Sequence, residues 1–297
     1  MNIGFVGLGL MGQPMVERLL QAGFALHVFS ENADTMSGMQ QQGALPGASV
    51  ADVAGKVDVF CSCRVTAQQS RAVFTGPDGV LSATSRPSVC IDFATIDPMT
   101  SREIGQMLVE GGIDFLDAPV SGGPDGVRAG TLSIIVGGTA AAVTAVRAVF
   151  DALGKQTFHM GDVGAGVTTK LCNNMISITT HALVAEAMVL GAKCGVDAAE
   201  LYEVLRNSSA YSRTLERVVP KHFLPRNFEA TATIETIMKD LQAAIDLSVE
   251  EGVRLRLPEA AMRWFGDAVE QGHIGDDIAS VILPMENIAG ARVGEQD

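Results

Sequence analysis

Short apolar runs alternate with amphipathic helical patterns through the first half of this chain, and this alternation constrains its fold more than any other feature. A strand that is followed by a helix and a second strand usually returns to the sheet as a parallel neighbour. We therefore predict an α/β fold with a doubly wound, mostly parallel sheet. The expected strands are residues 3–6, 25–29, 57–62, 89–91, 115–117 and 133–136.

The alternation stops near residue 160, and the pattern after residue 164 is helical. A proline-free segment from 165 to 193 predicts one long helix, which Gly195 would end. Further helices are expected at 198–207, 234–251 and 258–271. We therefore predict two domains, with the sheet in residues 1–163 and an all-helical domain in residues 164–297, joined by the long helix. The last residues, 293–297, are expected to fray.

Charge and cysteine content exclude several classes of protein. The 21 Lys and Arg against 34 Asp and Glu give a net charge of −13, which repels phosphate, so we expect neither nucleic acid nor a membrane as partner. We expect Gly, Asn or charged residues to interrupt every apolar stretch before the roughly 18 residues that a membrane span requires. We therefore expect no membrane-spanning segment. The five cysteines contain no Cys-x-x-Cys pair and the histidines are scattered, so we expect no metal site. This cysteine usage, and the lack of a leader pattern at the N-terminus, predict a cytoplasmic protein.

Residues 7–12 read Gly-Leu-Gly-Leu-Met-Gly and lie between an apolar strand and an amphipathic helix. In this context the first glycine permits a tight turn, the second lets a diphosphate approach, and the third lets helix and strand pack closely. Unpaired N–H groups at the helix start would bind the anion. A tight turn without a ligand is the alternative, but the register of strand, motif and helix favours a Rossmann-type, dinucleotide-binding domain. The expected cofactor-binding residues here are Gly7, Leu8, Gly9, Leu10, Met11 and Gly12.

The end of the second predicted strand should contact the adenosine ribose of such a cofactor. Glu31 lies 19 residues after Gly12, and no Lys or Arg occurs from residue 19 to residue 55. A carboxylate accepts hydrogen bonds from both ribose hydroxyls, whereas a 2′-phosphate needs a cation. We therefore expect NAD in preference to NADP, with Ser30, Glu31 and Asn32 at the ribose. A solvated loop acid is the alternative interpretation of Glu31.

Three further segments identify a family. Residues 117–123 read Asp-Ala-Pro-Val-Ser-Gly-Gly, residues 164–174 open the long helix, and residues 239–241 read Lys-Asp-Leu. Together with the glycine turn, and in this order, they resemble the β-hydroxyacid dehydrogenase family, which includes 3-hydroxyisobutyrate dehydrogenase and tartronate semialdehyde reductase. The resemblance covers nearly the whole chain. It implies a homo-oligomer, a homodimer or homotetramer, with the active site in the cleft between the two domains.

Lys170 and Asn174 are four residues apart, so they share one face of the predicted helix. The positive end of the helix dipole and burial beside a cofactor would both lower the pKa of a lysine near the helix start, which suits a general acid/base. The Asn174 amide can hold the substrate hydroxyl. On its own Lys170 would be interpreted as a surface lysine, but the accompanying motifs favour the catalytic role.

Ser121, Gly122 and Gly123 offer one hydroxyl and successive unhindered N–H groups, which suit a carboxylate, although a strand-exit turn fits them equally. The resemblance implies that this segment binds the acid group of the substrate. It also implies a cofactor-lining role for Cys63, Arg64, Thr95 and Lys239.

Several positions depart from the family pattern. Ala94 precedes Thr95 where a serine is common, and Cys63 and Arg64 stand where Leu-Pro is usual. Ser30 occupies a position where Asp or Asn is frequent. Asp125 would add a negative charge to the anion site if it faced inward. These departures leave the identity of the substrate open.

The favoured activity is hydride transfer between NAD and a small 3-hydroxy acid of the 3-hydroxyisobutyrate type, or its semialdehyde, with Lys170 as general acid/base. One alternative is an NADPH-dependent reductase of small aldehyde acids such as glyoxylate or succinic semialdehyde. An imine reductase fits less well, because such relatives usually lack the lysine. A non-catalytic, dinucleotide-binding regulatory protein is a further alternative, which the intact Lys170 and Asn174 disfavour. His181 is expected to be a satisfied histidine within the helical domain.

Overall fold

The computed structural model describes residues 1–294 and divides into two compact units, Met1–Lys170 and a second unit that begins at Leu171. The first unit is a sheet flanked by helices and the second is helical, which confirms the predicted fold class. The division falls within one continuous helix, α9 (Ala165–Lys193), whose bounds are those predicted. The domain boundary drawn at residue 163 stays a prediction.

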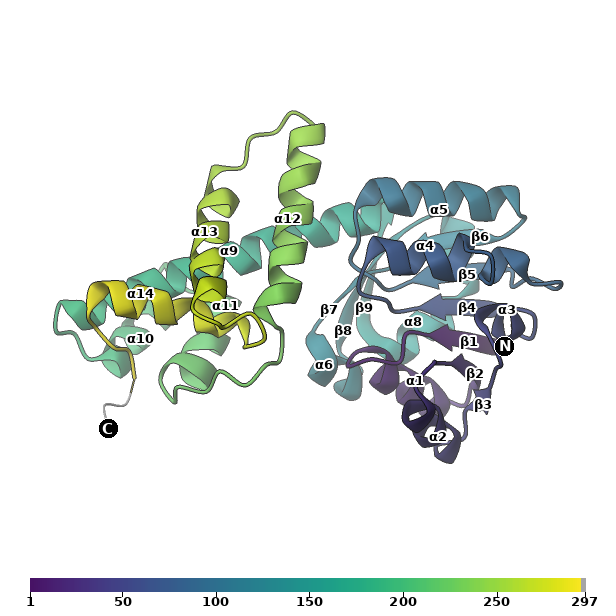
Figure 1. Cartoon of the computed structure of the whole chain (residues 1–297), viewed down its shortest axis with the longest axis horizontal. Helices are drawn as coiled ribbons and strands as arrows, with labels where there is room; N and C mark the ends of the chain where they lie inside the picture. The colour runs from purple at the N-terminus through teal and green to yellow at the C-terminus, as the bar shows by residue number, and fades with distance from the viewer. Residues whose placement is uncertain (295–297) are drawn as a thin grey trace. The chain divides into compact units, whose positions relative to one another are not determined.

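A 9-stranded sheet forms the centre of the first unit (Figure 1). Its order is β3-β2-β1-β4-β5-β6-β8-β7, with β9 paired to β8. The pairs from β3 through β6 are parallel, whereas β8 runs antiparallel to both β6 and β7. The strands are β1 (Asn2–Val6), β2 (Ala25–Phe29), β3 (Leu45–Pro46), β4 (Val59–Ser62), β5 (Val89–Asp92), β6 (Asp114–Asp117), β7 (Val120–Ser121), β8 (Leu132–Gly137) and β9 (Gly154–Gly161).

Helices cover both faces of this sheet. One face packs against α1, α6 and α8 through an apolar cluster that includes Leu19 and Phe150, and the other packs against α3, α4 and α5 around Phe60, Phe74 and Phe115. Buried on both faces, β4 and β5 contain the continuous apolar runs typical of parallel strands. The helices are α1 (Gly12–Gln21), α2 (Ala33–Gln41), α3 (Val50–Ala54), α4 (Ala67–Thr75), η1 (Val80–Ser82), α5 (Pro98–Glu110), α6 (Gly123–Ala129), α7 (Ala140–Ala145) and α8 (Arg147–Leu153).

The second unit buries a single apolar cluster around Phe223 and Phe265. Ile178, Ala185 and Met188 contribute the inward face of α9 to this cluster. Gly195 ends α9 in the left-handed conformation (φ +82°), as its sequence position predicts. The other elements are α10 (Ala198–Arg206), α11 (Arg213–Val218), the π-helical turn η2 (Val219–Phe223), α12 (Ile234–Glu250), α13 (Arg256–Glu270), η3 (Ile278–Val281) and α14 (Ile282–Ala289).

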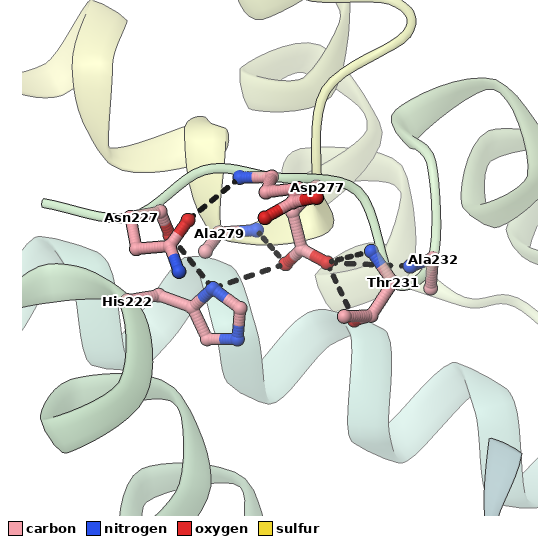
Figure 2. Close-up of polar contacts among 7 residues, drawn as sticks. His222, Asn227, Thr231, Ala232, Asp277 and Ala279 are labelled. Atoms are coloured by element: carbon pink, nitrogen blue, oxygen red, sulfur yellow. Dashed lines mark hydrogen bonds and ion pairs between the residues drawn. The ribbon is translucent and has the colours of Figure 1, made fainter. Parts of the chain in front are cut away.

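A buried carboxylate holds the loop that leads into α12 (Figure 2). Asp277 accepts hydrogen bonds from the N–H and the hydroxyl of Thr231 (2.9 and 2.7 Å), from the Ala232 N–H (3.2 Å) and from the Ala279 N–H (3.1 Å). Burial acts to raise the pKa of Asp277, but the hydrogen bonds outweigh it and the pKa is lowered. The loop is therefore fixed to the start of η3 by an ionised side chain.

His181 is the satisfied histidine that we expected. Its Nδ1 donates a hydrogen bond to the carbonyl of Ser177 (2.8 Å), and burial lowers its pKa to about 4. The ring is therefore neutral at physiological pH and serves packing.

Two expectations from the sequence, one on membrane spans and one on the C-terminal residues, are wrong. By length and composition α9 could cross a membrane, so not every apolar stretch is interrupted early. One such helix is weak evidence, because a core helix passes the same test, and α9 supplies part of the core. Val293 is not frayed: it is buried and its N–H donates to Glu286 (2.7 Å). Residues 295–297 lie outside the described part of the chain.

Candidate active site

The carboxyl ends of four parallel strands meet at one edge of the sheet, and most predicted site residues of the first unit follow them. Strand register aligns Val6 of β1 with Ser62 of β4, Asp92 of β5 and Asp117 of β6. The loops that begin there contain the glycine turn, the segment 63–64 and Thr95, and the Ser-Gly-Gly segment follows β7. In open α/β sheets ligands bind at this edge.

The geometry of the glycine turn fits a dinucleotide diphosphate. Gly7 has a positive φ of +94°, which a side chain would strain. A Cβ on Gly12 would overlap the carbonyl oxygen of Gly7, so helix and strand pack here without room for a methyl group. A Cβ on Gly9 would meet nothing within 4 Å, so its backbone is open to a ligand. No side chain caps the start of α1. The Gln13 N–H donates to the Gly9 carbonyl (3.1 Å) and Pro14 has no N–H, so in this first turn the Gly12 N–H is the group left for an anion.

The three residues predicted at the ribose differ in their availability. Asn32 is the N-cap of α2, because its side chain accepts from the Thr35 N–H (2.9 Å). Ser30 accepts from the Asn32 N–H (3.2 Å). The exposed Glu31 has no hydrogen bond or ion pair among residues 1–294. Of the three, Glu31 is therefore the side chain free to contact a ribose.

The Ser-Gly-Gly segment makes a turn between β7 and α6. Gly122 and Gly123 both have positive φ (140° and 66°), a conformation that glycine adopts without strain. Asp125 is exposed and pairs with Arg128 (3.3 Å). The extra negative charge therefore faces solvent, not the segment.

Asp117, at the end of β6, fixes the start of α9. Its two carboxylate oxygens accept from the N–H groups of Gly164 and Val167, each at 2.7 Å. Burial raises the pKa of Asp117 to about 6, although these hydrogen bonds act to lower it. Gly166 packs so closely on the end of β6 that a Cβ there would lie 2.6 Å from the Asp117 carbonyl oxygen. The sheet thus holds the first turn of the helix that carries Lys170.

In the helical unit, Asn174 is oriented by α12. Its Nδ2 donates to Oδ2 of Asp240 (2.8 Å), a buried residue whose other oxygen lies 2.7 Å from Lys239 Nζ. Its Oδ1 accepts from Asn173 (3.2 Å). An amide has two N–H groups and two acceptor lone pairs, so Asn174 keeps one of each for a substrate hydroxyl.

Lys170 lies one helical turn before Asn174 on α9, and it is only 8% exposed. A lysine is rarely buried to this extent unless it is paired. Helical spacing places the two side chains on the same face of α9.

Two carboxylates that hold parts of the candidate site were not singled out from the sequence. Asp117 and Asp240 both occur in the recognised motifs, but their partners lie far away along the chain, at residues 164–167 and at residue 174. The feature of the sequence that could have indicated these two residues is that each lies beside a predicted site segment, one rich in glycine and one containing a lysine. Among residues 1–294 the structure contains no group of three His, Cys, Asp or Glu side chains that could hold a metal ion.

Comparisons with known proteins cover the same two units. A family model described as the NAD binding domain of 6-phosphogluconate dehydrogenase matches residues 2–161, and one described as NAD-binding of NADP-dependent 3-hydroxyisobutyrate dehydrogenase matches residues 164–285. The 2-(hydroxymethyl)glutarate dehydrogenase of Eubacterium barkeri is 33% identical over 292 residues, which cover 98% of this chain and 97% of that protein. The 3-hydroxyisobutyrate dehydrogenase of Pseudomonas aeruginosa is 37% identical over 250 residues, which cover 82% of this chain and 84% of that protein. A solved structure of Mycobacterium tuberculosis 3-hydroxyisobutyrate dehydrogenase with L-serine has a TM-score of 0.88 at 29% identity, covering 96% of this chain and 98% of that one.

Proposed function

Because the chain belongs to the β-hydroxyacid dehydrogenase family, we propose that it transfers a hydride between a nicotinamide cofactor and a small 3-hydroxy acid or its semialdehyde. When bound, the nicotinamide supplies or accepts the hydride. The observation that carries the proposal is the buried Lys170 one turn before Asn174 on α9. A non-catalytic dinucleotide-binding protein would have no need of this pair.

Each residue has a stated task in this proposal. Lys170 takes the hydroxyl proton in the oxidation direction and returns it in reduction. Asn174, held by Asp240, orients the hydroxyl. Ser121 and the N–H groups of Gly122 and Gly123 bind the carboxylate. Lys239 and Thr95 contact the cofactor, as the family resemblance implies.

The direct test is a screen of small 3-hydroxy acids with NAD and NADP, followed by absorbance at the reduced-cofactor band near roughly 340 nm. We expect turnover only of substrates with a free carboxylate, because the Ser121–Gly123 segment is proposed to bind it. Simple alcohols of the same size serve as controls. Equal turnover of the alcohols would contradict the carboxylate site, and no turnover of any hydroxy acid would contradict the proposed activity.

We propose NAD as the preferred cofactor. Glu31 is available at the end of β2, and the nearest basic residue after it, Lys56, is paired with Asp52 (2.7 Å). Residues 19–55 contain no Lys or Arg, so a 2′-phosphate beside Glu31 would meet a carboxylate and no cation from this segment. The ratio of kcat/KM for NAD and NADP tests this, with about a ten- to hundredfold preference for NAD expected. Glu31→Arg should move the ratio toward NADP, and a wild-type ratio of one or less contradicts the proposal.

We also propose a homo-oligomer, a homodimer or homotetramer, formed through the outward face of α9. Ile176, Leu183 and Leu190 are 65%, 61% and 66% exposed on this face. Their spacing of seven residues is that of helix pairs. It is also symmetrical about Leu183, so an antiparallel second copy of α9 would pair Ile176 with Leu190 and Leu183 with itself. A second copy of the chain is therefore the occupant that this face suits.

The cytoplasm is the proposed location. The five cysteines are all free, two of them exposed on α9 and after its end, which is compatible with a reducing compartment.

A further inference from the structure

Arg64 is an unusual cation at the cofactor edge of the sheet. It follows β4, and its predecessor Cys63 donates its backbone N–H to the carbonyl of Val6 at the end of β1 (2.9 Å). A Cβ placed on Gly7 would lie 3.1 Å from Cδ of Arg64 and would overlap the carbonyl of Cys63. The aliphatic stem of Arg64 therefore lies directly against the glycine turn.

Within residues 1–294 the guanidinium of Arg64 has no hydrogen bond or ion pair with another protein group. Its Nε is buried without a hydrogen-bond acceptor, and no ion pair among residues 1–294 includes it. The other two basic residues within positions 1–64 are engaged: Arg18 donates to the Ala152 carbonyl (3.2 Å) and Lys56 pairs with Asp52. A buried guanidinium N–H without an acceptor is costly, so an anionic ligand at this position would be favoured.

The strand order of the sheet indicates which anionic group of a dinucleotide Arg64 can reach. β2 and β4 lie on opposite sides of β1. Glu31 follows β2 and Arg64 follows β4, so the ribose carboxylate and the guanidinium flank the glycine turn on opposite sides. A 2′-phosphate belongs to the adenosine ribose and thus to the β2 side. The anion within reach of the β4 side of the turn is the diphosphate, which the open backbone of Gly9 and the uncapped start of α1 also suit.

We propose that the Arg64 guanidinium binds the diphosphate of the nicotinamide dinucleotide and raises the affinity for NAD and NADP equally. The residue sets how tightly the cofactor is bound, while the choice between the two cofactors belongs to the β2 side. This inference rests on the dinucleotide-binding role of the first unit. Although the chain has a net charge of −13, the Arg64 side chain supplies a positive charge at the place where the anion binds.

The experiment measures binding without turnover. Dissociation constants of NADH, NADPH, ADP-ribose and adenosine are determined by isothermal titration calorimetry for wild type, Arg64→Ala and Arg64→Lys. We expect Arg64→Ala to weaken NADH, NADPH and ADP-ribose by about 10- to 100-fold, with the NADH/NADPH ratio unchanged. Adenosine, which has no phosphate, should bind as before. Arg64→Lys should recover part of the affinity, and the salt dependence of NADH binding should become less steep in Arg64→Ala.

Arg71→Ala is the matched control, because Arg71 lies in the same unit and pairs with Glu103 on α5. It should leave all four dissociation constants unchanged. Thermal unfolding of each variant establishes that it is folded, and Arg64→Lys keeps the test valid if the alanine variant is not.

Three results would overturn the inference. Unchanged NADH affinity in a folded Arg64→Ala variant excludes a diphosphate contact. Loss confined to NADPH would place the guanidinium at the 2′-phosphate. Unchanged NADH affinity with a raised KM for the hydroxy acid would assign it to the substrate carboxylate. Failure of the wild type to bind any dinucleotide would instead contradict the proposed function.

Discussion

Lys170 is the residue on which the proposed chemistry depends most. Lys170→Ala should lower kcat by about 10²–10⁴-fold, because it removes the proton relay, and should leave NADH affinity nearly unchanged. Lys170→Arg should fail almost as completely, since a guanidinium does not release its proton near neutral pH. Steady-state kinetics and NADH titration measure both effects. A folded alanine variant that binds NADH and keeps most of its turnover contradicts the mechanism.

Asp240 is expected to act through Asn174. Without its carboxylate the Asn174 amide loses the hydrogen bond that fixes its orientation, so Asp240→Ala should lower kcat by about 10- to 100-fold. NADH affinity should change less than kcat, because Asp240 contacts the cofactor site only through its pairing with Lys239. The matched control is Asp246→Ala on the same helix, where an exposed carboxylate accepts a hydrogen bond from Gln242 (2.7 Å). A purely structural Asp240 would lower the melting temperature without changing kcat in the folded fraction.

At the scale of single elements, two buried carboxylates are compared: Asp92 at the end of β5 and Asp117 at the end of β6. Replacing each by asparagine should change the free energy of unfolding in opposite directions. Burial raises the pKa of Asp92 to about 6, although hydrogen bonds, among them that from the Ala94 N–H to its Oδ1 (3.1 Å), act to lower it. The folded state therefore retains this proton between about pH 4 and pH 6, so the free energy of unfolding falls as pH rises through that window. Asp92→Asn should remove this dependence and stabilise the protein by about 2–3 kcal/mol at pH 7.

Asp117→Asn is the contrasting variant. An amide can accept from only one of the two N–H groups that the carboxylate now satisfies, so we expect a loss of about 1–3 kcal/mol at pH 7. Urea unfolding at pH 4.5 and 7.5 measures both variants. Destabilisation by Asp92→Asn at pH 7.5 would show that the Asp92 carboxylate is needed in its charged form.

The sequence predicted those elements whose structure is determined locally. The helix at 165–193 follows from the absence of proline and from Gly195 at its end, and β1, β2 and β4 follow from apolar runs. It did not predict β9, because residues 154–161 are mostly exposed and polar and so lack an apolar period. Their strand conformation depends on pairing with β8, which no local pattern encodes. The π-helical turn η2 at Pro220 was not predicted either.

The candidate site divides in the same way. The glycine turn and the Lys170–Asn174 spacing are local, and the structure places them as the patterns indicate. Asp117 and Asp240 could not be assigned roles, because their partners lie 47 and 66 residues away in sequence. The sequence pattern likewise does not determine whether Asp125 faces inward, and in the structure it pairs with Arg128 at the surface.

At the scale of the whole molecule, the proposed antiparallel pairing of α9 makes a cross-linking prediction. Symmetry about Leu183 brings Cys172 of one copy opposite Cys194 of the other, and both are exposed. Mild oxidation of the purified protein should therefore yield a disulfide-linked dimer that a reductant reverses. Non-reducing gel electrophoresis detects it.

Single-cysteine variants test the direction of pairing. Cys172→Ser and Cys194→Ser should each abolish the cross-link. A parallel arrangement would instead let either remaining cysteine join to its own copy. Leu183→Glu should shift the protein toward the monomer in size-exclusion chromatography with light scattering, and a wild type that is monomeric at all concentrations contradicts the homo-oligomer.

The continuity of α9 limits how such a chain can change in length during evolution. Lys170 ends the first unit and Asn174 belongs to the second, yet no loop separates them. Inserting one residue between them would rotate the two side chains about 100° apart around the helix axis, and deleting one would do the same in the other direction. Surface loops elsewhere can lengthen freely. Insertions and deletions should therefore be absent from this one turn in any functional descendant, however far the rest of the sequence diverges.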